Sequence, residues 1–175
     1  MKNTKNITLC GIIAALSTVI MLTAYFPYLT YAIPAIAGCL AIVLMIECGT
    51  KWAIMGFVVS AVLSLIFAEP EAKMLFIGFF GYYPIIKGKI ESLNKRPVEY
   101  LLKFLIFNVA VIVVYLIITN IFGIPMNDMG ATFKYASLVL LALGNVVFAI
   151  YDVAVTRIIS LYWNKLHPKI KKMFR

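Results

Sequence analysis

Charged residues are scarce in this chain. They make up 13% of its 175 residues, whereas 63% are hydrophobic, and the mean hydropathy is +0.99. A typical soluble domain is roughly 45–50% apolar and about 25% charged, so a soluble fold would lack the polar residues needed to cover its surface. The high hydrophobicity also excludes intrinsic disorder. The composition therefore predicts an integral membrane protein that is all-α.

Residues and motifs that carry chemistry are also scarce. The three cysteines show no CxxC spacing, and His167 is the only histidine, which excludes a typical disulfide scaffold or zinc site. The sequence contains no HExxH, P-loop or GxSxG motif. Asp152 has no second aspartate to pair with in an intramembrane protease. We therefore expect no catalytic residues, no metal and no cofactor, and hence not an enzyme.

Apolar runs predict how often the chain crosses the bilayer. A spanning helix needs about 20 mostly apolar residues. Six segments qualify, of which the second and third are short, and they form a single domain that ends in a basic tail at 163–175. The predicted spans are 7–26, 34–48, 53–68, 73–90, 101–122 and 135–162.

The distribution of Lys and Arg predicts the orientation. With six spans, 14 of the 16 basic residues fall on one side, and only Lys73 and Lys134 fall on the other. Cytoplasmic loops accumulate positive charge, so both termini are predicted to be cytoplasmic. This asymmetry accounts for the net charge of +9 without a nucleic-acid partner. The basic tail is a topology anchor that anionic membrane lipids would also attract.

Polar residues on the last two predicted spans form two helical stripes. If these spans pair antiparallel about a loop centred near residue 129, Asn108 lies level with Asp152, and Tyr115 lies level with Asn145. We expect Asn108 and Asp152 to form a structural polar pair. Tyr115 and Asn145 lie nearer the membrane midplane and are candidate ligand-binding residues.

Aromatic and polar residues elsewhere extend the candidate binding site. The fourth span combines glycines, aromatics and Pro84, which predicts a kink beside a cavity. Ordinary packing explains such a helix equally well, and an interfacial aromatic belt explains the outer tyrosines. The further candidates for binding a planar ligand are Tyr28, Tyr31, Phe79, Tyr83, Asn127 and Asp128.

The first span carries small residues at three- and four-residue spacings. Small side chains allow another helix to approach closely in lipid, either within the chain or from a partner. The strip consists of Gly11, Ala14, Ala15 and Thr18.

Taken together, these features resemble the substrate-binding S component of energy-coupling factor transporters. The segment 10–17 (CGIIAALS) is similar to that family's first-helix stretch, in which an alanine-x-x-x-alanine motif docks on a transmembrane coupling subunit. Gly11 and Ala15 occupy the two small positions, so the first departs from alanine. The resemblance covers the whole chain by architecture, but this stretch alone by specific residues.

The resemblance implies a function and partners. Members of the family capture a vitamin or related micronutrient from outside the bacterial inner membrane. They deliver it together with a transmembrane coupling subunit and two ATPase subunits. The strip of Gly11, Ala14, Ala15 and Thr18 would be the coupling interface. Which nutrient is bound is not readable from the sequence.

Two other classes of function remain open. The chain could be a structural, assembly or immunity-type membrane protein whose polar stripes only hold helices together. It could instead be a small exporter that works without a separate motor.

Overall fold

A computed structural model describes residues 2–26, 28–93, 95–121 and 136–168. These residues form helices joined by short turns, with no strand among them, so the predicted all-helical class is confirmed for the described parts of the chain. The long helices are α1 (Lys2–Leu22), α4 (Thr50–Phe67), α7 (Arg96–Ile121) and α8 (Ala136–Leu161). The shorter elements are η1 (Thr23–Tyr25), α2 (Ala32–Cys39), α3 (Ala41–Glu47), α5 (Pro70–Leu75), η2 (Phe76–Phe80), α6 (Tyr83–Glu91) and η4 (Tyr162–Leu166).

Four helices in the described residues are long and apolar enough to cross a membrane. They cover Asn3–Tyr25, Thr50–Phe67, Arg96–Ile117 and Leu141–Leu166. The two remaining predicted spans, 34–48 and 73–90, each consist of shorter helical pieces. The first divides at Leu40 between α2 and α3.

The second interrupted segment contains a π-helical turn. Within it the amide of Gly81 donates to the carbonyl of Phe76 at 2.8 Å, a bond between residues five apart. A break at Gly81 and Tyr82 follows, and Pro84 lies in the first turn of α6, where its missing N–H costs nothing. The irregularity expected at Pro84 therefore lies one turn earlier in the chain. Such π turns are frequent at functional sites.

Two glycines explain how the interrupted segments pack. A side-chain carbon on Gly38 of α2 would overlap the backbone carbonyl of Phe80, so only glycine lets α2 approach η2 this closely. Gly49 has a φ of +90° between α3 and α4, a conformation that residues with a side chain rarely adopt.

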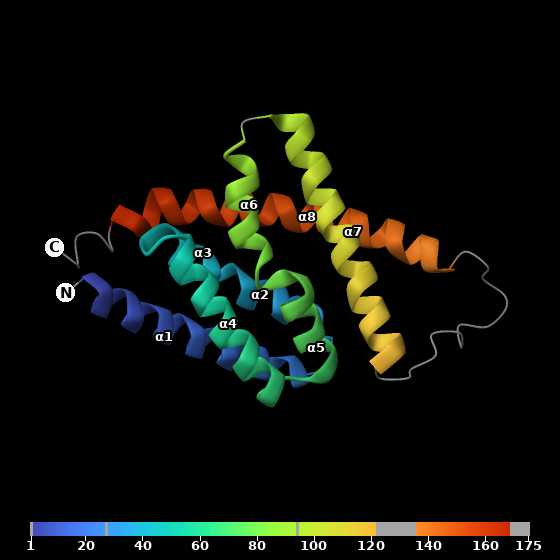
Figure 1. The fold of residues 1–175 in the computed structure, drawn as a ribbon, viewed down its shortest axis with the longest axis horizontal. Helices are drawn as coiled ribbons and strands as arrows, with labels where there is room; N and C mark the ends of the chain where they lie inside the picture. The colour runs from blue at the N-terminus through green and yellow to red at the C-terminus, as the bar shows by residue number, and fades with distance from the viewer. Residues whose placement is uncertain (1, 27, 94, 122–135, 169–175) are drawn as a thin grey trace.

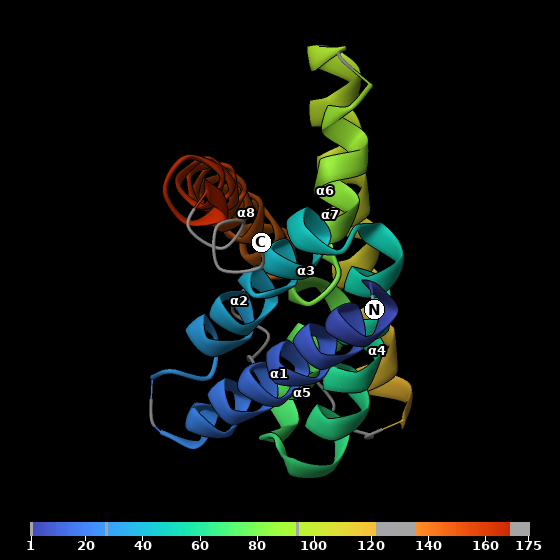
Figure 2. The ribbon, with the colours of Figure 1, turned by 90° about the vertical axis from the view of Figure 1, so that its left-hand side faces the viewer.

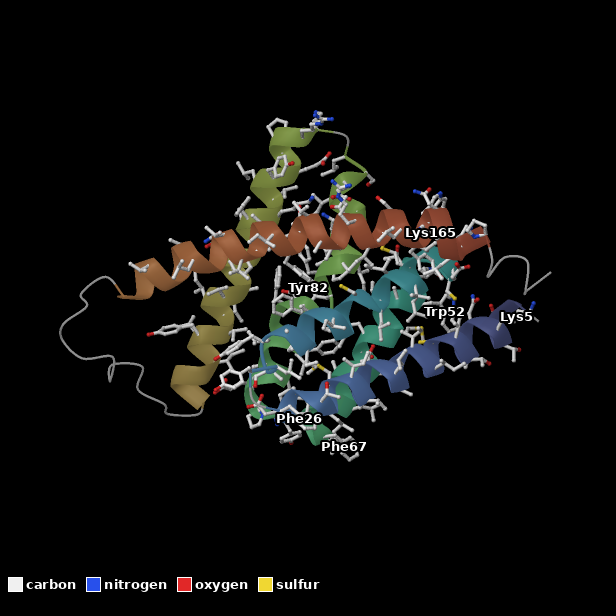
Figure 3. The ribbon with its side chains drawn as sticks, turned by 180° about the vertical axis from the view of Figure 1, so that it is seen from behind. Lys5, Phe26, Trp52, Phe67, Tyr82 and Lys165 are labelled. Atoms are coloured by element: carbon white, nitrogen blue, oxygen red, sulfur yellow. The ribbon has the colours of Figure 1, made fainter. Side chains whose placement is uncertain are left out.

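The start of α1 and the end of α8 lie at the same end of the molecule (Figures 1 and 2). Figure 3 shows Lys5, Trp52 and Lys165 toward this end, with Phe26 and Phe67 away from it. At this end Glu47 accepts a hydrogen bond from the hydroxyl of Tyr162 at 2.9 Å. That bond connects the end of α3 to the turn that follows α8.

Helix α7 crosses α8 steeply, and does not run beside it as an antiparallel partner (Figures 1 and 2). The two helices meet around a buried aromatic cluster. The cluster comprises Phe79 of η2, Tyr83 of α6, Ala110 of α7 and Phe148 of α8. This crossing positions the candidate site.

Candidate ligand-binding site

An apolar cleft of about 530 Å³ opens among η2, α7 and α8, next to the start of α2. Its volume lies within the range of roughly 300–1,000 Å³ that is usual for small-molecule sites. Aromatic rings supply much of its wall. The lining residues are Tyr31, Leu75, Phe79, Phe80, Phe107, Ala110, Val111, Val114, Tyr115, Gly144, Val147, Phe148 and Tyr151.

Stacked rings form the floor of this cleft. Phe107 of α7 stacks on Phe148 of α8 with centroids 4.7 Å apart and planes 7° from parallel. Phe79 stacks on Tyr83 with centroids 4.7 Å apart and forms an edge-to-face pair with Phe148 with centroids 5.6 Å apart. Interlocked rings of this kind hold one another in place, so the cleft has a preformed aromatic floor.

A buried cluster of charges lies on the far side of Tyr83. The hydroxyl of Tyr83 donates to the carboxylate of Asp152 at 2.5 Å. Lys87 also donates to this carboxylate, and Lys103 binds its second oxygen at 3.1 Å. Glu91 closes the cluster by accepting from Lys87 at 2.8 Å and from Lys103 at 2.7 Å. Two cations thus face two carboxylates.

The pairing explains how Lys87 can be fully buried, with 0% of its side chain exposed. An unpaired charge removed from water costs several kcal/mol, whereas a pair with further hydrogen bonds offsets much of this cost. We define Lys87, Glu91, Lys103 and Asp152 as the charge quartet.

A second, polar cavity of about 620 Å³ opens on the quartet from between the start of α7 and the second half of α8. Phe148 lines this cavity as well as the apolar cleft. The apolar cleft and the polar cavity are therefore neighbours that share Phe148 as a wall residue.

The residues predicted from sequence to bind a ligand do not all reach the cleft. Tyr31, Phe79 and Tyr115 line it. Tyr83 lies beneath the floor, bonded to Asp152. Tyr28 is 97% exposed and lies outside the cleft wall. The predicted residues Asn127 and Asp128 fall outside the described residues.

The predicted pairing of Asn108 with Asp152 is wrong, and Asn145 is absent from the cleft wall that Tyr115 lines. Asn108 and Asn145 exchange two hydrogen bonds of 3.0 and 3.1 Å, while Asp152 is held by the lysines of the quartet. The equal-depth argument assumed two helices lying side by side around a symmetric loop. Because α7 crosses α8 instead (Figure 1), their contacts follow a different register.

The small-residue strip on α1 is divided between two faces. Ala14 is 1% exposed and Thr18 is 9% exposed, and the Thr18 hydroxyl donates to the Ala14 carbonyl at 2.9 Å. Gly11 and Ala15 are exposed, and a side-chain carbon on Gly11 would touch nothing within 4 Å. The expectation of one uniform strip is therefore corrected: only Gly11 and Ala15 lie on the outer face.

At the mouth of the cleft, the hydroxyl of Tyr31 lies 3.4 Å from the carboxylate of Glu71. The negative charge of Glu71 raises the pKa of Tyr31, so its phenol stays protonated at neutral pH and can donate. This tyrosine, Tyr115 and Tyr151 are the lining residues that carry a polar side-chain group, and the rest of the lining is apolar.

Sequence reasoning missed the charge quartet and the rings of Phe107, Phe148 and Tyr151. Lys87 and Lys103 were assigned to cytoplasmic segments by charge counting. Two signals pointed to another role: Lys87 and Glu91 are four residues apart on one helix, where such pairs meet, and a buried Asp152 requires a counter-ion.

Neither family models, curated proteins nor solved structures provide a match to this chain. Across the described residues, no group of three or more His, Cys, Asp or Glu side chains is placed to hold a metal ion.

Proposed function

We propose that this chain is the substrate-binding subunit of a nutrient uptake system in the bacterial inner membrane. It captures a vitamin or related micronutrient from outside and delivers it with a separate coupling subunit and two ATPases. The single observation that carries the proposal is the preformed aromatic cleft of about 530 Å³. A cavity of that size with stacked rings as its floor suits one small planar molecule.

We further propose that the chain crosses the membrane six times with both ends in the cytoplasm. The interrupted segments 34–48 and 73–90 would be the second and fourth crossings. Non-helical backbone at membrane depth is tolerated where it is packed against protein or lines a cavity, and η2 does both, because Phe79 and Phe80 line the cleft. The grouping of Lys and Arg supports the orientation.

The proposed coupling interface is the outer face of α1 at Gly11 and Ala15. These small residues are exposed and leave room for a helix from a partner subunit to approach closely.

The decisive experiment identifies what the protein carries. Native mass spectrometry of the protein, purified in mild detergent from its host, is expected to show one bound small molecule. The variant Gly144→Phe adds a ring to the cleft wall, where a side-chain carbon would lie 3.5 Å from Phe107, and should lose that molecule. Ala142→Phe, a matched change at an exposed position on the same helix, should keep it.

A structural or assembly role is the second candidate, favoured by the polar pair Asn108–Asn145, which is satisfied entirely within the chain. It predicts no bound molecule in the wild type and no difference between the two phenylalanine variants. A self-sufficient exporter would instead move substrate repeatedly across vesicles that contain no other protein.

A further inference from the structure

The polar cavity between α7 and α8 contains two arginines with no partner of opposite charge. Arg96 lies at the start of α7 and Arg157 in the second half of α8, and both line the cavity. Within the described ranges neither guanidinium forms an ion pair. Both side chains are exposed and are therefore available to a ligand.

The other charges of the cavity compensate this pair only in part. The two lysines and two carboxylates of the quartet neutralise one another. What remains on the wall is Arg96 and Arg157 against Glu99, a surplus of one positive charge. A guanidinium binds phosphate oxygens through two parallel hydrogen bonds, so the chemistry of the wall favours a phosphate group.

Apolar surface adjoins the same cavity. On α7, Leu101 is 63% exposed, and on α8 Ile150 is 66% and Val153 58% exposed. Val153 is itself part of the cavity wall. In a membrane chain such side chains face acyl tails, so the cavity combines sites for a charged headgroup and for hydrocarbon.

We propose that this cavity binds one anionic phospholipid, with its phosphate between Arg96 and Arg157 and its acyl chains along the adjoining faces of α7 and α8. Pockets of basic residues between membrane helices are suited to anionic headgroups. The site is separate from the apolar cleft and does not depend on the proposed uptake function.

The test measures retention of dioleoylphosphatidylglycerol by the purified full-length protein, by native mass spectrometry during titration with that lipid. The variant Arg96→Gln/Arg157→Gln removes two charges worth about 1 kcal/mol each and should weaken retention by roughly thirtyfold. The control Lys51→Gln/Lys165→Gln removes the same charge at exposed positions outside the cavity and should change it less than twofold. Dioleoylphosphatidylcholine, which lacks net charge, should bind weakly to all three proteins.

Four outcomes overturn the proposal. Equal losses in both double variants would indicate diffuse attraction to basic surface, and no loss in either would exclude the site. Displacement of the lipid by excess soluble glycerol 3-phosphate would show that a free phosphate compound is the occupant. If the double glutamine variant fails to fold, the single variants Arg96→Gln and Arg157→Gln take its place, and unchanged retention in both would equally exclude the site.

Discussion

The ammonium group of Lys87 donates to the carboxylate of Asp152, 65 residues further along the chain. This contact fastens α6 to α8, and Tyr83 and Lys103 add their own hydrogen bonds to the same carboxylate. Tyr83 connects this carboxylate to the aromatic floor of the cleft, because its ring stacks on Phe79. The quartet therefore helps to hold the floor of the cleft in position, although none of its members lines the cleft.

Removing the carboxylate of Asp152 should destabilise the protein. Asp152→Asn removes the negative charge that the buried Lys87 shares with Glu91, and breaking a buried pair in this way typically costs about 3–5 kcal/mol. For a chain of this size we expect the midpoint of thermal unfolding in detergent to fall by on the order of 10 °C. Glu99→Gln, which removes a carboxylate outside the quartet, is the control. Equal midpoints for the two variants would contradict the structural role of the quartet.

Asn145 should affect stability and not ligand affinity. Its amide is committed to Asn108, and it is absent from the cleft wall. Asn145→Leu and Asn108→Leu should each cost about 0.6 kcal/mol or somewhat more, and the double variant should cost less than the sum because neither partner is left unsatisfied. The measurement compares the unfolding midpoints of wild type, the two single variants and the double variant. A loss of ligand affinity in Asn145→Leu alone would contradict this prediction and show that Asn145 contributes to ligand binding.

The long helices were readable from the sequence because length and apolarity are local properties. Runs of apolar residues identified the regions of α1, α4, α7 and α8, and the proline-containing aromatic segment at 73–90 was expected to be irregular. Three of the candidate ligand-binding residues, Tyr31, Phe79 and Tyr115, do line the cleft.

Tertiary partners were not readable in the same way. Whether Asp152 meets Asn108 or Lys87 depends on the crossing angle of α7 and α8, and no local pattern encodes that angle. Counting charges also treats every lysine near the end of a span as facing water. Lys87 is buried instead, because its pairing with Asp152 offsets the cost of removing its charge from water.

The contribution of Glu91 should give stability a dependence on acid pH. Burial alone would raise its pKa, but hydrogen bonds from Lys103 and Lys87 outweigh this effect and hold the pKa below the ordinary value of 4.5. The unfolded chain therefore binds the proton more tightly than the folded one. The stabilisation is fully present above the ordinary pKa and is lost as pH falls through the lowered one. Between pH 6 and pH 3, the unfolding midpoint of wild type should fall more steeply than that of Glu91→Gln. Parallel curves would contradict the prediction.

The two faces of α1 should respond differently to bulky substitutions. Gly11→Leu/Ala15→Leu places side chains on an exposed face, so the unfolding midpoint and ligand retention should stay close to wild type. Under the proposed function the same variant should lose association with the coupling subunit, measured by co-purification, and nutrient uptake by cells. Ala14→Leu forces a large side chain into a position that is 1% exposed, and overpacking of this kind typically costs about 1–3 kcal/mol, so it should lower the midpoint.

If Gly11→Leu/Ala15→Leu unfolds as readily as Ala14→Leu, the outer face packs within the protein. If the variant folds and still takes up nutrient at the wild-type rate, the coupling partner docks elsewhere.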